Sequence, residues 1–274
     1  MLAFIIILSS LISLAILLFL LYILVFVRPR AKSPENKALL CDYAHRGLHD
    51  GNTGETPENS LAAFEKACAE GFGIELDVQL SRDGVVMVFH DSTLIRMTGV
   101  DKKLCELDAT ELKNLSLAGT DQTIPTFSEV LELVGGRVPL LIELKGESTD
   151  SSLCPKVAEL LSEYTGDYCI ESFNPLLIRN MRKLMPEVYY GQLYTNVCKE
   201  KKKNSILNIL LTCMAFNFLA HPDFIAYSYH YRNSLPVKLT TKFYSAESFV
   251  WTVRDDGEMA KAKKNGECAI FERP

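Results

Sequence analysis

The sequence of 274 residues predicts an α/β protein of the (β/α)8 TIM-barrel type, preceded by one N-terminal transmembrane helix. Two observations carry this prediction. The chain begins with a long uncharged apolar run, and after it short β-rich apolar runs alternate with helical patterns. Strands that alternate with helices favour a parallel sheet. Eight such repeats within one domain of about 235 residues favour closure into a barrel.

The N-terminal run covers residues 1–27 and holds no charged side chain. About 20 consecutive apolar residues cross the hydrocarbon core of a bilayer as a helix. A cleaved signal peptide is the alternative, but it needs a basic start, a shorter apolar core and a small-residue cleavage site. We therefore predict a transmembrane anchor at 1–27, a polar linker at 28–38 and a barrel domain at 39–274.

The charges that flank this run predict how it is oriented. No Lys or Arg precedes it, whereas Arg28, Arg30, Lys32 and Lys37 follow it closely. Basic residues tend to stay on the cytoplasmic side. The eight cysteines are scattered without disulfide-type spacing, which agrees with that side. The prediction is a single-pass protein of the cell membrane whose C-terminal domain faces the cytoplasm.

The overall charge restricts the class of partner. With 29 basic and 34 acidic residues the net charge is −5, which argues against a nucleic-acid groove. A local basic cluster lies between Lys199 and Lys203. A solvated surface is the favoured interpretation of this cluster, and contact with anionic lipid headgroups is the alternative. The sequence does not indicate an oligomeric state.

The strands are predicted from apolar runs bounded by turn residues. They are 42–45, 74–80, 140–143, 169–172, 188–193, 224–228, 249–253 and 268–271. A further run at 85–89 follows the second strand across Asp83-Gly84, a dipeptide typical of hairpin turns. We interpret it as an extension of that strand.

The helices are predicted at 61–69, 126–134, 153–164, 175–185 and 256–264. Asn59 or Ser60 is expected to cap the first and Gly71 to close it, and Pro175 suits a first helical position. Segment 206–220 is strongly apolar but too short to span a bilayer. We favour a barrel helix buried on one side. A helix lying in the membrane interface, helped by the nearby lysines, is the alternative.

Polar side chains occupy the ends of several predicted strands, where a buried strand would otherwise carry Val, Ile or Leu. In a (β/α)8 barrel, active sites form at the carboxyl-terminal ends of the strands. The polar groups there are Ala44-His45-Arg46-Gly47, Glu75-Leu76-Asp77, Phe89-His90-Asp91 and Glu143-Leu144-Lys145. The sequence therefore predicts a site at this end.

Glu75 and Asp77 are two positions apart on one strand, so their side chains point to the same face. Ile74, Leu76 and Val78 alternate with them and suit the outer helix layer, which leaves the acids facing inward. Glu143 comes from the neighbouring strand. Three buried carboxylates repel one another unless a cation compensates them. Oxygen ligands favour Mg2+ or Ca2+ over Zn2+. An outward, solvated pair of acids is the disfavoured alternative.

His45 and His90 lie at the same predicted rim as these acids. Histidine titrates near neutrality and can serve as general acid or base. Arg46 and Lys145 add positive charge of the kind that recognises phosphate. The combination of a metal, two histidines and two cations suits an anionic phosphodiester substrate.

At this point the chain resembles the glycerophosphodiester phosphodiesterase family, in the manner of a membrane-anchored bacterial member. The resemblance runs in family order over nearly the whole region after residue 38. The matching segments are His45-Arg46-Gly47, Pro57-Glu58-Asn59-Ser60, Glu75-Leu76-Asp77-Val78, Asp83-Gly84, Val86 to Asp91, Ile124-Pro125-Thr126, Glu143-Leu144-Lys145, Ser172-Phe173 and Trp251-Thr252-Val253.

The resemblance implies metal-dependent hydrolysis of glycerophosphodiesters to glycerol 3-phosphate and an alcohol. It implies that one histidine deprotonates the hydroxyl beside the phosphate and that the other protonates the leaving alcohol. The implied roles are Glu75, Asp77 and Glu143 as ligands of Mg2+ or Ca2+, His45 and His90 as the acid/base pair, and Arg46, Lys145 and Trp251 as substrate-binding residues. Trp251 is interpreted equally well as a packing residue at the top of the barrel.

Two positions depart from the family pattern. Glu272 stands in place of the usual Asp of an Asp-x-Pro sequence, and Arg254 stands where Asn is frequent. We expect both to affect substrate details at the rim without contacting the metal or histidine set. Two other functions stay open: a lysophospholipase D-like enzyme acting on lysophospholipids, and an inactive, membrane-tethered binding protein. The presence of all five metal and histidine residues argues against the inactive protein.

Overall fold

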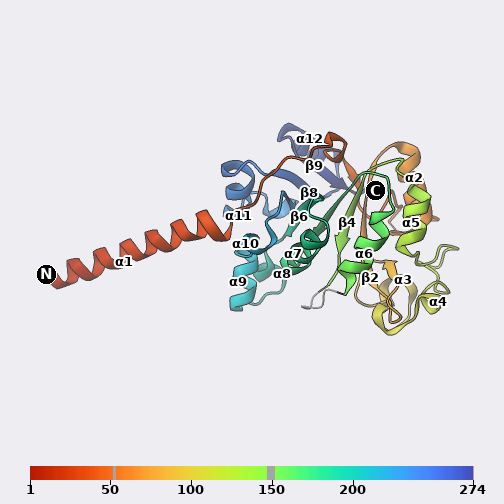
Figure 1. The fold of residues 1–274 in the computed structure, drawn as a ribbon, viewed down its shortest axis with the longest axis horizontal. Coiled ribbons are helices and arrows are strands. Elements are labelled where there is room, and N and C mark those ends of the chain that lie inside the picture. Colours follow the sequence, from red (N-terminus) through yellow and green to blue (C-terminus); the bar gives the residue numbers. More distant parts are fainter. Residues whose placement is uncertain (52–53, 147–151, 274) are drawn as a thin grey trace.

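The computed structural model describes residues 1–51, 54–146 and 152–273. Its sheet has the strand order β1-β9-β8-β7-β6-β5-β4-β2-β3, and β1 also pairs with β2, which closes eight parallel strands into a barrel (Figure 1). The predicted (β/α)8 fold is therefore confirmed. The strands are β1 (Tyr43–Ala44), β2 (Gly73–Leu80), β3 (Val86–Val88), β4 (Leu140–Leu144), β5 (Tyr168–Ser172), β6 (Tyr189–Tyr194), β7 (Phe224–Ser228), β8 (Glu247–Val253) and β9 (Cys268–Phe271).

Helices surround this barrel, and one long helix projects away from it (Figure 1). They are α1 (Leu2–Leu21), α2 (Leu61–Glu70), α3 (Ile95–Thr98), α4 (Ala109–Leu112), α5 (Phe127–Val134), α6 (Leu153–Ser162), α7 (Pro175–Leu184), α8 (Val197–Glu200), α9 (Ile206–Thr212), α10 (Asn217–Ala220), α11 (Leu235–Lys238) and α12 (Asp256–Lys264). Two π-helical turns, Tyr22–Phe26 and Leu239–Phe243, continue α1 and α11.

The strands and helices predicted from the sequence are present, with small differences at their ends. β3 pairs antiparallel with β2, so the run at 85–89 extends the second strand as predicted. Ser60, rather than Asn59, caps α2: its hydroxyl accepts a hydrogen bond from the amide of Ala63. Asn59 instead donates its side-chain amide to Asp77.

The prediction for segment 206–220 was wrong in one respect. The chain does not form a single helix buried on one side but two short helices, α9 and α10, separated by a turn. The large apolar side chains of α9 are mostly exposed, whereas α10 has buried residues and packs against α7 and the turn Tyr22–Phe26. The segment is apolar, as its sequence indicates, but the composition of a segment alone does not predict which surface its side chains contact.

The barrel interior is apolar at its amino-terminal half. Tyr43, Leu141, Cys169, Phe224 and Phe249 fill it and are fully buried. Two residues further along each strand the side chain again faces inward. On β4 and β5 these next inward positions hold Glu143 and Glu171. The apolar layer therefore forms a floor beneath a polar site.

One helical segment, Leu2–Phe26, is long and apolar enough to cross a membrane. Its 25 residues lie outside the folded barrel, and its most apolar stretch is not buried at all. Figure 1 shows α1 leaving the barrel on the side of α9, α10 and α11. Val27, directly after it, is fully buried, so the base of this segment is packed against the domain.

Candidate active site

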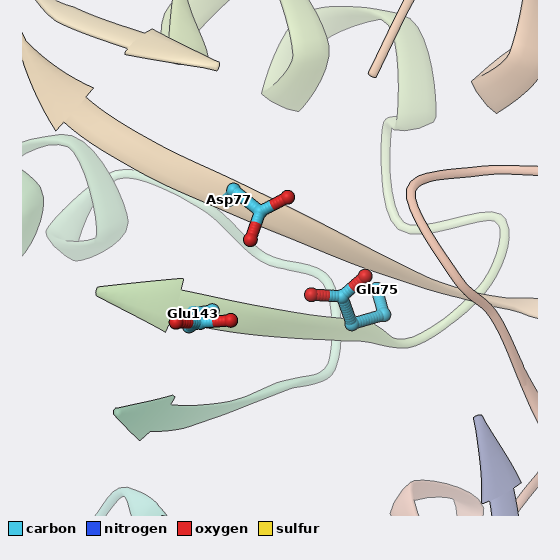
Figure 2. A group of neighbouring side chains, drawn as sticks. All are labelled: Glu75, Asp77 and Glu143. Atoms are coloured by element: carbon cyan, nitrogen blue, oxygen red, sulfur yellow. The ribbon is translucent and has the colours of Figure 1, made fainter. Parts of the chain in front are cut away.

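The three predicted metal ligands lie together at the mouth, by which we mean the rim formed by the carboxyl-terminal ends of the strands. Glu75 and Asp77 project from β2 and Glu143 from β4 (Figure 2). Ligand oxygens of this acidic trio lie within 4.8 Å of one another, and all three residues are buried. The three carboxylates thus face the barrel interior together, as strand alternation predicts.

A fourth acid, Glu171 on β5, was not singled out from the sequence. It is paired in register with Glu143, which is itself paired with Asp77. Its side chain is only 1% exposed, and its Oε2 has no hydrogen-bond partner within the described residues. The same alternation, with Ile170 facing outward, is the signal that could have found it.

Two cations lie against these acids. The Nζ of Lys145 is 2.9 Å from Oδ1 of Asp77 and 2.8 Å from Oε2 of Glu143. The backbone N–H of Arg46 donates to Oε2 of Glu75 at 2.9 Å. The guanidinium of Arg46 donates to Glu58 at 2.8 Å and lies 3.7 Å from Asp77. Both predicted cationic residues are therefore at the site, but the carboxylate of Glu58 partly neutralises the charge of Arg46.

Negative charge remains in excess, and the pKa values reflect it. Burial, with the charges of Asp77 and Glu143, raises the pKa of Glu75 well above its usual range. Burial, with the charges of Glu75 and Glu143, also raises the pKa of Glu171 well above its usual range. Burial opposes ionisation of Asp77 as well, yet Lys145, His90 and Arg46 hold its pKa below the usual range.

These residues fit a divalent cation. The donors are carboxylate oxygens from adjacent strands. The nearby Oε2 of Glu171, which is also buried, has no hydrogen-bond partner among the described residues. Oxygen-only donors match Mg2+ or Ca2+. An added cation would also compensate the repulsion that raises the pKa of Glu75. The acidic trio could therefore hold such an ion.

His45 follows β1, and its Nδ1 lies 2.6 Å from Oε1 of Glu272. The other oxygen of Glu272 accepts a hydrogen bond from Nε of Arg254 at 3.0 Å. The expectation that Glu272 does not contact the histidine set was therefore wrong, whereas Arg254 acts on His45 only through Glu272. β1 pairs with β9, so the residue after β9 reaches the residue after β1. The two departures from the family pattern are partners of each other.

Burial and this pairing act in opposite directions on the pKa of His45. Burial lowers the pKa of His45 to about 4, although the Glu272 carboxylate acts in the opposite direction. The imidazole is therefore neutral at pH 7. With Nδ1 directed to Glu272, its Nε2 faces Glu75, whose Oε2 is 3.9 Å away.

His90 has a similar carboxylate partner. Its Nδ1 lies 2.7 Å from Oδ1 of Asp91, whose other oxygen accepts from Nε of Arg96 at 2.6 Å. Arg96 also donates to Glu58, the residue that binds Arg46. The two histidines are thus each backed by a carboxylate and an arginine. The sequence alone does not indicate these roles of Asp91, Arg96 and Glu58.

The turn after β1 depends on a glycine. Arg46 and Gly47 both have positive φ, at 55° and 79°. A Cβ on Gly47 would lie 2.9 Å from the Cβ of Ala63 and 2.9 Å from Cδ1 of Phe64, both in α2. The tight approach of this turn to α2 places the backbone N–H of Arg46 against Glu75.

We expect Gly47→Ala to lower the free energy of unfolding by about 2–4 kcal/mol, because backbone strain and the clash with α2 add. Gly71→Ala is the matched control, since Gly71 also has positive φ but meets nothing within 4 Å. It should lose only about 1 kcal/mol. Urea unfolding in detergent, followed by circular dichroism, measures both. Equal losses at the two positions would contradict the predicted clash.

Trp251 lies on β8 and lines a hollow of about 320 Å3 at the mouth, together with Glu200, His230 and Arg254. Its indole N–H donates to the carbonyl of Ala226 at 3.2 Å, and its ring meets Phe173 edge-on at 5.7 Å. The side chain therefore packs at the top of the barrel and borders the hollow at the same time. The two interpretations of Trp251 do not exclude each other.

Known proteins are similar to this chain over most of the barrel domain. The model of the glycerophosphoryl diester phosphodiesterase family matches residues 45–272. A glycerophosphodiester phosphodiesterase of Caldanaerobacter subterraneus subsp. tengcongensis is 36% identical over 158 residues, which are 53% of this chain and 65% of that protein. A lysophospholipase D of Rattus norvegicus is 34% identical over 133 residues, 44% of this chain and 41% of that protein.

The chain matches less than two thirds of the length of these curated relatives. The crystal structure of a glycerophosphodiester phosphodiesterase from Thermotoga maritima superposes with a TM-score of 0.65 at 29% identity. That match covers 84% of this chain and 94% of the other. The family match extends from the first histidine of the site to Glu272. The chain belongs to the glycerophosphoryl diester phosphodiesterase family.

Proposed function

We propose that this protein hydrolyses glycerophosphodiesters to glycerol 3-phosphate and an alcohol, using a divalent cation and the pair His45 and His90. The observation that carries the proposal is the acidic trio at the mouth with its carboxylate oxygens within 4.8 Å of one another. Two carboxylate-backed histidines flank it, and two cations accompany it. The names of the curated relatives support the same substrate class.

In the mechanism we propose, His45 is the general base. Its imidazole is neutral at pH 7 and held through Nδ1 by Glu272, which leaves Nε2 to accept the proton of the substrate hydroxyl beside the phosphate. That oxygen forms a bond to phosphorus while the bond to the alcohol breaks. His90 supplies the proton of the departing alcohol. Attack from within the substrate gains the advantage of proximity.

The second step reverses these roles. His90 accepts a proton from the water that adds to phosphorus. The ring bond of the cyclic phosphate breaks, and His45 donates its proton to the departing glycerol oxygen, which returns both histidines to their starting states. Arg46 and Lys145 bind phosphoryl oxygens as negative charge develops. Glu75, Asp77 and Glu143 would hold the divalent cation, which supplies Lewis-acid stabilisation of the same oxygens. Trp251, at the edge of the hollow, would contact the glycerol side.

Incubation of the purified full-length protein in detergent with glycerophosphocholine tests this function. Phosphorus NMR should show glycerol 3-phosphate as the product, with transient cyclic phosphate. EDTA should abolish turnover, and added Mg2+ or Ca2+ should restore it and so identify the ion. An absence of product with either ion would support the alternative of an inactive binding protein.

Glu272 is expected to act as a positioning residue. Glu272→Gln should lower kcat about 10²-fold with little change in KM, because the charge that orients His45 and stabilises its protonated form is lost. Arg254→Gln should cost much less, since Arg254 is largely exposed and acts only through Glu272. Steady-state kinetics of both variants measures the effect. Partial recovery in Glu272→Asp would separate positioning from a purely structural role.

We also propose the domain organisation 1–27, 28–38 and 39–274, with the first segment as a single-pass anchor in the cell membrane. The length and apolar surface of Leu2–Phe26 support an anchor. The residue Pro274 lies outside the described residues. The basic residues after the anchor support a cytoplasmic barrel.

Labelling of Cys105, which is exposed on the barrel, tests the orientation. A membrane-impermeant maleimide should modify this thiol only after cells are lysed. Modification in intact cells would reverse the proposed sidedness. A Cys105→Ser variant identifies the signal that comes from this thiol.

A further inference from the structure

Four large apolar side chains of α9 are exposed in the folded domain: Ile206, Leu207, Ile209 and Leu210. Ile206 is 79% and Leu207 58% exposed. Asn208, the buried residue of this helix, donates its side-chain amide to the carbonyl of Lys203 and so fixes the turn before it. Contiguous apolar surface of this kind typically marks a contact with a membrane or another molecule.

This apolar surface begins at the base of the anchor. The hydroxyl of Tyr22 donates to the carbonyl of Cys213, the residue after α9, at 3.0 Å. On the other side, the hydroxyl of Tyr244 donates to the carbonyl of Ile23 at 2.7 Å. Its neighbour Phe243 is 65% exposed. The two segments that contact the anchor base, α9 with Cys213 and Leu239–Phe243 with Tyr244, therefore both carry exposed apolar residues. Figure 1 shows α9 and α11 on the side of the barrel from which α1 leaves.

Helix length places this point at the membrane interface. The apolar segment has 25 residues, from Leu2 to Phe26. About 20 residues suffice to cross the hydrocarbon core, so the last five, at about 1.5 Å each, extend roughly 7 Å into the interfacial region. Tyr22, Ile23 and Phe26 belong to these five. Their partners, Cys213, Tyr244 and Phe218, must lie at the same depth.

The charges around this surface suit an anionic leaflet. Lys201, Lys202 and Lys203 precede α9 and are exposed, and Lys242 adjoins Phe243. Each lysine near an anionic membrane contributes about 1 kcal/mol of attraction. A protein of net charge −5 gathers positive charge at this place. A basic, partly apolar surface around a membrane anchor has the composition of interfacial segments.

The same surface is joined to the mouth. The backbone N–H of Cys198 in α8 donates to the hydroxyl of Thr212 at the end of α9, which ties the two helices together. Glu200, the last residue of α8, lines the hollow beside Trp251. A few residues therefore separate the exposed apolar side chains from the place where substrate would enter.

We propose that the exposed apolar side chains of α9 and Phe243, with the flanking lysines, form an interfacial docking surface that rests on the anionic leaflet of the membrane crossed by α1. The bilayer is the occupant because the anchor base and this surface share one level. Docking brings the mouth to the headgroups, so that a glycerophosphodiester with one acyl chain, a lysophospholipid, enters from the bilayer. The choice of substrate rests on the proposed hydrolytic function, whereas docking does not.

Docking is tested on the full-length chain in nanodiscs that contain anionic phospholipid and bromine-labelled acyl chains, which quench tryptophan. Leu207→Trp places a reporter on α9, and Ile95→Trp, an exposed apolar position on α3, is the matched control. The parent protein, with its single tryptophan, gives the background. We expect at least about twofold quenching at position 207 and none at 95. Equal quenching at both positions overturns the docking surface.

The charge contribution is tested in the Leu207→Trp background. Glu replacements of Lys201, Lys202 and Lys203 together should reduce quenching in anionic discs and bring it to the level seen in purely zwitterionic discs. Quenching that does not respond to the three replacements or to the lipid charge overturns the role of the lysines.

Substrate delivery is tested with the double variant Ile206→Ser, Leu207→Ser. Its kcat/KM for lysophosphatidylcholine in the discs should fall about tenfold, while turnover of soluble glycerophosphocholine stays at the parental level. An equal loss on both substrates, or no loss on either, overturns delivery from the bilayer. If the parent hydrolyses neither substrate, the proposed function fails, and the quenching experiment still decides whether the surface docks.

Discussion

Replacement of either His45 or His90 by alanine is expected to lower kcat for glycerophosphocholine by about 10²- to 10⁴-fold, the range of a lost general acid or base. Each imidazole is held by a carboxylate at 2.6 or 2.7 Å, so neither is free to replace the other. Each of the two steps needs one group to accept a proton and one to donate it. Steady-state kinetics with saturating Mg2+ or Ca2+ measures the loss.

The double replacement sharpens this prediction. If the two histidines act as one unit, the double variant should be scarcely slower than the slower single variant, because effects within such a unit are not additive. His221→Asn is the control, since His221 is exposed and has positive φ, which Asn tolerates. It should keep parental turnover. Parental activity in either alanine variant would remove that histidine from the scheme.

Glu75→Gln is expected to have opposite effects on stability and on function. Without metal, the buried carboxyl group is destabilised by burial and by Asp77 and Glu143, so the neutral amide should raise the free energy of unfolding by about 1–3 kcal/mol. The amide oxygen can still accept from the backbone N–H of Arg46. With metal, one ligand is missing, and turnover should fall at least about 10²-fold.

The pH dependence of this prediction follows from the raised pKa of Glu75. The folded, metal-free protein keeps a proton on Glu75 that the unfolded chain releases above its ordinary pKa of 4.5. Metal-free stability should therefore decrease as pH rises above that value, until Glu75 itself ionises. A divalent cation must displace this proton, so its stabilising effect should grow with pH. Glu75→Gln should show less of both trends.

Thermal unfolding in EDTA and in excess Mg2+ or Ca2+, each across a pH series, provides the measurement. Glu132→Gln, on the exposed side of α5, is the matched control and should behave as the parent does. A Glu75→Gln variant that is less stable than the parent in EDTA, and still stabilised by metal, would contradict the assigned role of Glu75.

The acidic trio could be predicted because strand alternation is a local rule. Glu75 and Asp77 lie two positions apart between buried apolar residues, so their common inward direction followed from the strand alone. The rule applies equally to Glu171 on β5. A single acid in a short strand, without a second acid two positions away, is however too weak a signal to predict a site residue. The fold itself was predictable for the same reason, since each strand and helix is marked by its own residues.

The partner of His45 could not be predicted in this way. Glu272 lies 227 positions away, and only the pairing of the first strand with the last brings the two together. The extra methylene of Glu relative to Asp, and the guanidinium of Arg254, looked like unrelated departures in the sequence. The exposure of α9 could not be predicted either, because a helix that packs into a core and a helix that lies on a membrane can have the same apolar composition.

The contact between His45 and Glu272 crosses the seam of the barrel, by which we mean the pairing of β1 with β9 that closes it. β1 has only two residues, and its neighbour across the seam, β9, is the last strand in chain order. A chain that has assembled all its other strands but left this seam open would still lack an oriented His45. Enzyme activity during refolding should therefore report when the seam closes, and it should appear later than the signal from helix formation.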